Sequence, residues 1–175
     1  MISCLRIGAA AACLTFASLA PVSSFAQPDE TSVSSDRSQM LVGSWTQGAE
    51  RLVGEGNEQV RISQGLEDIR GDGTSNSSLR MEIMSAEMPE DLRIYDVVVE
   101  SQWRLVGDEY FTTPIKVDVT YAGDNPVGLN VAKAIEAEFM KPTEPMIIVS
   151  LNKDNYVARG TDGTLISMQR KRLTP

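Results

Sequence analysis

Apolar and polar side chains alternate with a period of two along three long stretches of this chain. Residues 77–84, 92–106 and 115–121 each place mainly apolar residues at every second position. Successive side chains of a β-strand point to opposite faces, so this pattern predicts half-buried strands. The longest stretch keeps its period of two through Trp103, and the most regular alternation begins at Ile115. The middle of the chain is therefore expected to be extended.

Shorter apolar runs, bounded by turn-forming residues, predict further strands on both sides of this region. They cover residues 41–46, 59–69, 109–113, 146–151, 156–159 and 164–170. Glycine lies beside aspartate in several of the intervening turns, where the backbone often needs a positive φ. About eight short strands in succession are typical of an antiparallel meander that closes into a barrel or a tightly wrapped sheet. The expected fold class is mainly β.

One helix is predicted, near residues 127–140. Its apolar residues recur at helical spacing, at Val131, Ile135 and Phe139. Asp124 or Asn125 can cap its start, and a proline suits the first helical position.

Residues 1–26 have the organisation of a secretory signal peptide. Arg6 precedes an apolar run over residues 7–20, and Ser24 and Ala26 provide the small residues of a cleavage site. The run is shorter than the ~20 apolar residues of a spanning helix, which disfavours an uncleaved membrane anchor. We therefore expect an exported protein, periplasmic or secreted.

The remainder of the chain is expected to form one domain. Residues 27–40 are polar and predict a flexible leader without packed structure. The barrel domain is expected over residues 41–172, which is long enough to bury a core. Both cysteines, Cys4 and Cys13, belong to the signal peptide. The mature protein therefore depends on its core and not on disulfides.

Composition excludes several kinds of chemistry. The chain has no histidine, so Ser-His-Asp catalysis and His-based metal sites are excluded. Without Arg6, 15 of the 16 Lys and Arg residues remain against 24 Asp and Glu residues, which gives a net charge of −9. This acidity argues against nucleic acid as a partner, because nucleic-acid binding needs a basic surface.

A resemblance to a known family rests on both ends of the domain. The segment Leu41-Val42-Gly43-Ser44-Trp45 resembles the Gly-x-Trp signature of lipocalin-like (calycin) β-barrels, and Arg170 resembles the late arginine that lies across that tryptophan. Segments 72–74 and 103–108 resemble recurring parts of small exported bacterial lipocalin-like domains. The resemblance implies an eight-stranded lipocalin-like barrel in which the glycine, the tryptophan and the arginine close one end.

The expected barrel interior supplies the candidate ligand-binding residues. They share the inward faces of the alternating strands and are Tyr95, Val99, Trp103, Val117, Val119 and Tyr121. Ile115 is placed on the same face. An eight-stranded barrel encloses either a filled core or one small ligand. Bulky β-branched residues favour the filled core, whereas the apolar lining suits a hydrophobic ligand.

Acidic residues occur in adjacent pairs, which raises the question of carboxylate catalysis. Glu67 and Asp68 form one such pair, and two others lie at residues 90–91 and 108–109. A glycosidase needs two carboxylates that converge in a cleft. The spacing selects no such pair, so these residues are interpreted as solvated charges near turns.

Together these patterns favour an exported, non-enzymatic lipocalin-like protein that binds a small apolar molecule or an envelope component. The alternative is a structural or protein-interaction module with a filled core, which would use its helix or a sheet edge for contact. A catalyst built on Asp, Glu, Tyr or Lys is disfavoured, because the commonest catalytic groups are missing. No cofactor, no metal and no membrane span after signal removal are expected.

Overall fold

A computed structural model describes residues 30–53 and 59–171 as nine β-strands, two α-helices and a short 3-10 helix at Glu90–Leu92. The predicted signal peptide, residues 1–26, lies outside the described residues together with both cysteines. Every ladder between neighbouring strands is antiparallel. The described part of the chain is thus mainly β, as predicted.

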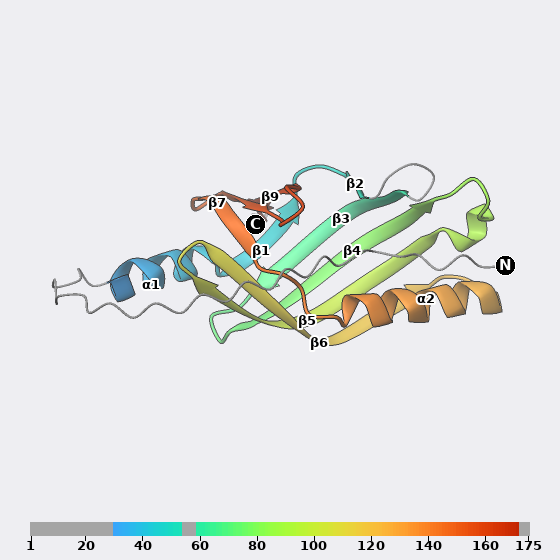
Figure 1. The fold of residues 1–175 in the computed structure, drawn as a ribbon, viewed down its shortest axis with the longest axis horizontal. Coiled ribbons are helices and arrows are strands. Elements are labelled where there is room, and N and C mark those ends of the chain that lie inside the picture. The colour runs from blue at the N-terminus through green and yellow to red at the C-terminus, as the bar shows by residue number, and fades with distance from the viewer. Residues whose placement is uncertain (1–29, 54–58, 172–175) are drawn as a thin grey trace, which may run out of the picture.

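Eight of these strands close into a barrel, which confirms the predicted architecture (Figure 1). The strands are β1 (Gly43–Gln47), β2 (Arg51–Val53), β3 (Gln59–Ile69), β4 (Thr74–Met84), β5 (Ile94–Val106), β6 (Glu109–Tyr121), β7 (Met146–Leu151), β8 (Asn155–Arg159) and β9 (Leu165–Arg170). Their order is β1-β9-β8-β7-β6-β5-β4-β3, and β1 also pairs with β3, which closes the ring. The short strand β2 lies outside this ring and pairs with β3.

The strands on the two sides of the barrel differ in length. Strands β3 to β6 have 11 to 13 residues, whereas β7 to β9 have 5 or 6. The ladder between β6 and β7 consists of Glu109↔Ile147 and Tyr110↔Met146. The long strands therefore continue past the short ones as an open sheet. Helix α2 (Pro126–Phe139) packs against β5 and β6 and lies along this extension (Figure 1).

The sequence around α2 explains where the helix begins and how closely it packs. The Asn125 side chain accepts a hydrogen bond from the Val127 amide at 3.0 Å, and Pro126 occupies the first turn. Gly128 is buried against the ring of Tyr121, where a Cβ atom would collide with the ring. The absence of a side chain at this position lets the helix approach β6. The predicted helix is confirmed, with its start shifted by one residue.

A tryptophan and an arginine meet at one end of the barrel, which we call the closed end. Trp45 is fully buried and pairs in register with Arg170, whose guanidinium carbon lies 4.1 Å from the centre of the indole ring. This guanidinium also donates to the backbone oxygens of Val42 and Met40, at 2.9 and 2.6 Å. Gly43 has a φ of +145°, and a Cβ atom there would overlap the guanidinium. These contacts hold the first and last strands together.

The expectation of an unstructured leader through residue 40 differs from the structure. Helix α1 covers Glu30–Leu41, so Leu41 ends a helix and does not begin the first strand. Leu41 is fully buried in the core, and its carbonyl accepts a hydrogen bond from the Trp45 indole at 2.8 Å. Arg37 forms an ion pair with Asp108, at the turn between β5 and β6. Contacts with residues distant in the chain stabilise this polar helix, and a local pattern could not reveal them.

The inward placement predicted for Ile115 is wrong. A β-bulge shifts the register between β5 and β6, so Glu100 pairs with Lys116 while Ser101 pairs with Pro114. Ile115 falls between these pairs and is 52 % exposed. One extra residue in a strand is enough to move a side chain from one face to the other.

Candidate functional site

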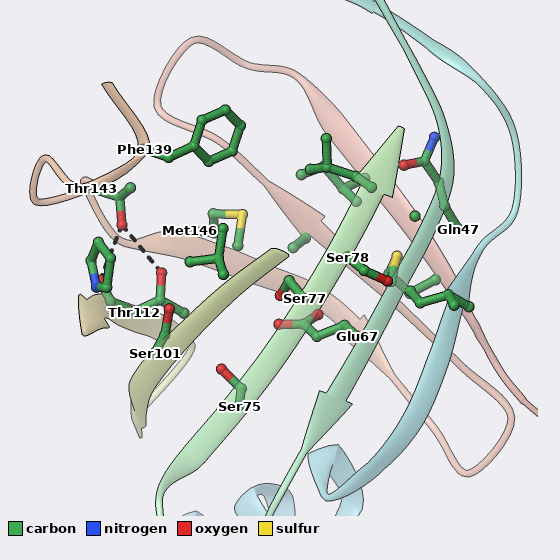
Figure 2. A pocket seen from close by; sticks show the side chains of 18 of the residues that line it. Gln47, Glu67, Ser75, Ser77, Ser78, Ser101, Thr112, Phe139, Thr143 and Met146 are labelled. Carbon is green, nitrogen blue, oxygen red and sulfur yellow. Dashed lines mark hydrogen bonds between the residues drawn. The ribbon is translucent and has the colours of Figure 1, made fainter. Parts of the chain in front are cut away.

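A cavity of about 220 Å³ lies inside the barrel, between the closed end and helix α2. Figure 2 shows Glu67, Ser75 and Ser77 pointing into this space, with Phe139 and Met146 on its other side. Thr143, an exposed residue just after α2, also lines the cavity, which therefore reaches the protein surface.

Small side chains on two neighbouring strands explain why space is left here. Ser75 and Ser77 face inward from β4, and Ser101 lies beside Ser75 on β5. Ser75 and Ser101 are also the buried polar residues of the described chain. Serine fills less volume than the valine, tyrosine and tryptophan found elsewhere on these faces, so the interior is not packed to the usual density.

The rest of the wall is mainly apolar, although several polar residues, among them two threonines, also line it. Its apolar members include Val99, Ala158, Ile166, Met168 and Met146. On the side of α2, the hydroxyls of Thr112 and Thr143 lie 3.2 Å apart, and the Thr143 hydroxyl donates to the Thr112 carbonyl at 3.1 Å. A mainly apolar lining with a few fixed polar groups is typical of small-molecule sites.

The most unusual group in the cavity is the carboxylate of Glu67. One of its oxygens accepts a hydrogen bond from the Tyr110 hydroxyl at 2.9 Å, and the other accepts one from the Tyr156 hydroxyl. Burial raises the pKa of Glu67, and the charge of Asp68 adds to this effect, whereas the two phenol hydrogen bonds oppose it. Burial is the larger influence, because it disfavours the charged form of an acid.

The two tyrosines keep their protons and act as donors to Glu67. Burial raises the pKa of both phenols well above the ordinary value, and the nearby Glu67 charge raises it further. The Ser75 hydroxyl opposes this rise in the pKa of Tyr110. Two tyrosines and one carboxylate therefore form a connected polar network at the base of a cavity whose wall is mainly apolar.

Arg51, on β2, is the basic residue among those that line the cavity. Its Nε atom is buried and has no hydrogen-bond partner among the described residues. Burial lowers the pKa of Arg51, and the charge of Asp162 opposes that change. The charged neighbour of this guanidinium is thus Asp162.

The structure brings one of the six predicted ligand-binding residues to the cavity. Val99 lines it, whereas Trp103 packs against the core of the closed end and donates to the Arg70 carbonyl at 2.9 Å. The other four lie further along the inward face of the long strands and are Tyr95, Val117, Val119 and Tyr121. The Tyr121 ring contacts α2, and the Tyr95 hydroxyl donates to the Leu92 carbonyl at 2.7 Å.

Sequence reasoning missed Glu67, because acidic pairs were assigned to solvated turns. The structure places it within β3, where it pairs with Ser77 and lies two residues before the buried Ile69. Asp68, its neighbour in sequence, points to the opposite face and is exposed. The spacing of two between Glu67 and Ile69 was the signal that could have identified an inward carboxylate.

A second hollow, of about 510 Å³, is larger but lies on the outer face of the barrel. Leu66, Ser78 and Val98 line it and share the outward face in the register of β3, β4 and β5. The ion pair between Arg80 and Asp96 borders it. Because few groups converge on a ligand there, we regard the interior cavity as the stronger candidate.

Comparisons with known proteins add no assignment. No protein-family model and no curated protein sequence matches the chain. Within residues 30–53 and 59–171, no group of three His, Cys, Asp or Glu side chains could hold a metal ion. No helix in these ranges is long and apolar enough to span a membrane. Function therefore has to be inferred from the cavity itself.

Proposed function

We propose that this chain is an exported lipocalin-like protein that binds a small, mainly apolar molecule inside its barrel and does not catalyse a reaction. The observation that carries the proposal is the cavity of about 220 Å³, which reaches the surface near Thr143. Pockets for drug-sized ligands usually measure about 300–1,000 Å³. The ligand should therefore be smaller than a typical drug, with one polar end.

The groups around the cavity support binding more than catalysis. A single carboxylate, Glu67, lines it, whereas glycoside hydrolysis needs two. Both oxygens of that carboxylate accept hydrogen bonds from phenols that hold their protons. A perturbed carboxyl pKa is also common in catalytic sites, but within the described residues none of the serines that line this cavity is hydrogen-bonded to Glu67, so no nucleophile is paired with a base there.

Two adjacent valines on β5 allow a matched test of the site. Val99 faces the cavity, and Val98 faces outward with 41 % exposure. We expect Val99→Phe to fill the cavity and to abolish binding, whereas Val98→Phe should leave it unchanged. Native mass spectrometry of freshly purified protein would detect a co-purified molecule. Methyl NMR with benzyl alcohol as the probe would report occupancy of the cavity through Val99, Ala158 and Met168.

The outcomes separate the interior site from the outer hollow. If Val98→Phe blocks the probe and Val99→Phe does not, the ligand binds on the outer face. If benzyl alcohol shifts no methyl group of the cavity and no molecule co-purifies, the binding function is contradicted. The interaction module is then favoured, with the edge strand β2 as its contact surface, since Leu52 and Val53 are 60 % and 41 % exposed there.

A further inference from the structure

Glu67 presents a carboxylate to the cavity without an ion-pair partner among the described residues. The charged group that acts on it is another acid, Asp68, while Arg51 has Asp162 as its charged neighbour. Removing an ionised carboxylate from water is costly unless it is paired. The phenols of Tyr110 and Tyr156 offset part of this cost.

The carboxylate still has capacity to accept hydrogen bonds. An ionised carboxyl group has about four lone-pair sites, and two phenol donors occupy two of them. Ser77 lies directly opposite Glu67 in the β3–β4 register and lines the same cavity, where its hydroxyl can accept a further donor. The polar end of the cavity is thus rich in acceptors, and it carries a negative charge when Glu67 is ionised.

Arg51 is the cation that lines the cavity, but its charged neighbour is Asp162 and it forms no ion pair with Glu67. Val99, which pairs with Ser77 on the next strand, forms an apolar wall together with Ala158 and Met168. A ligand that fits both parts has a compact hydrocarbon body and a group that donates several hydrogen bonds. A protonated amine meets these requirements, because an ammonium group has three donors and a positive charge.

We propose that the ligand of this cavity is a small organic cation, whose ammonium group donates to Glu67 while its apolar body lies against Val99, Ala158 and Met168. This inference rests on the binding function proposed above and names the chemical class of the ligand. Binding supplies the counterion that the folded chain lacks at Glu67. A neutral molecule of the same shape gains the apolar contacts without this pairing.

Three probes of one shape test the proposal. Benzylamine, benzyl alcohol and benzoate differ in charge, and isothermal titration calorimetry with methyl NMR measures their affinities for the full mature chain. Benzylamine should bind about tenfold or more tightly than benzyl alcohol, as expected for a charge-assisted hydrogen bond. Benzoate should bind most weakly.

Two isosteric variants locate the effect. Glu67→Gln should lower benzylamine affinity by about tenfold and leave benzyl alcohol affinity unchanged. Asp68→Asn removes the same charge one residue away, on the exposed outer face, and should leave benzyl alcohol affinity unchanged while lowering benzylamine affinity far less than Glu67→Gln does. If Glu67→Gln does not fold, the wild-type chain still provides the test through pH. Benzylamine affinity should fall as Glu67 is protonated, while Tyr110 and Tyr156 stay protonated and Asp68 remains exposed.

The results distinguish this inference from the function on which it rests. If benzylamine and benzyl alcohol bind equally well, or if Glu67→Gln binds benzylamine as the wild type does, the cationic ligand is ruled out while the binding function stands. If no probe reaches the cavity methyl groups of Val99, Ala158 and Met168, both proposals fail. Loss of benzylamine binding in Asp68→Asn as well as Glu67→Gln would attribute the preference to net charge and would also overturn the proposed contact.

Discussion

Replacing Glu67 with glutamine should change how the stability of the fold depends on pH. Burial raises the pKa of this carboxyl group in the folded state above its ordinary value of 4.5. An acid whose pKa is raised by folding favours the folded state when it is protonated. Its contribution to stability is therefore fully present below pH 4.5 and is lost as the pH rises through the raised folded-state pKa. Glutamine stays neutral and removes this dependence.

The size of the effect follows from linkage. Each unit by which folding raises the pKa corresponds to about 1.4 kcal/mol of unfolding free energy. The difference in unfolding free energy between wild type and Glu67→Gln should therefore change by at most about 1.4 kcal/mol per pH unit between the ordinary pKa and the raised folded-state pKa of Glu67. Below and above this pH range the difference should be constant. For a chain of this length, 1 kcal/mol corresponds to about 2–4 °C in the unfolding midpoint.

Urea unfolding followed by tryptophan fluorescence measures this difference at half-unit steps from pH 4 to pH 8, roughly the range over which a raised carboxyl pKa titrates. Trp45 lies in the core of the closed end and reports loss of the barrel. Carboxylates that do not interact with Glu67 contribute equally to both proteins, so the difference reports Glu67 and its coupling to Asp68. Asp68→Asn serves as the control with an exposed carboxylate. A difference that is flat across the whole range, or that grows with opposite sign, would refute the desolvation argument.

Two further substitutions test how the ends of the barrel are held. Arg170→Lys keeps the charge but loses the planar group that donates to the backbone oxygens of Met40 and Val42. The unfolding free energy measured by urea titration should therefore fall by about 1.5–3 kcal/mol. An unchanged unfolding midpoint would show that strand pairing alone closes this end. Gly128→Ala places a methyl group against the ring of Tyr121. The midpoint of thermal unfolding should fall, because overpacking costs about 1–3 kcal/mol of stability, which exceeds the gain from the higher helix propensity of alanine. A raised midpoint would mean that the ring moves aside freely.

Local patterns revealed the strands whose two faces meet different surroundings. β5 and β6 each have one face against the interior and one against solvent, so alternation located both. Pro114 suggested a break between two strands, yet β6 runs through it as a single element. The proline lies at the bulge beside Ser101, where the strand tolerates a missing amide donor. Alternation cannot show such an inserted residue, and this is why Ile115 was misplaced.

The cavity depends on register, which the sequence does not display. Ser75 and Ser101 create space because they are neighbours on adjacent strands, and their separation in sequence hides this. In β3, a second bulge with a positive φ at Gln64 interrupts the alternation before Glu67. Helix α1 was also missed, because its stability comes from the contacts of Arg37 and Leu41 with distant residues. The presence of the strands could thus be predicted from the sequence, whereas locating the cavity and its carboxylate required the register between neighbouring strands.

The contact between Arg170 and the backbone of Val42 joins residues 128 positions apart in sequence. Closure of such a contact carries a large loop entropy and slows folding, since barrels dominated by distant pairings fold in about milliseconds to seconds. The ring cannot close until β9 is available, so the nascent chain keeps its first strand unpaired on that side while the rest is made.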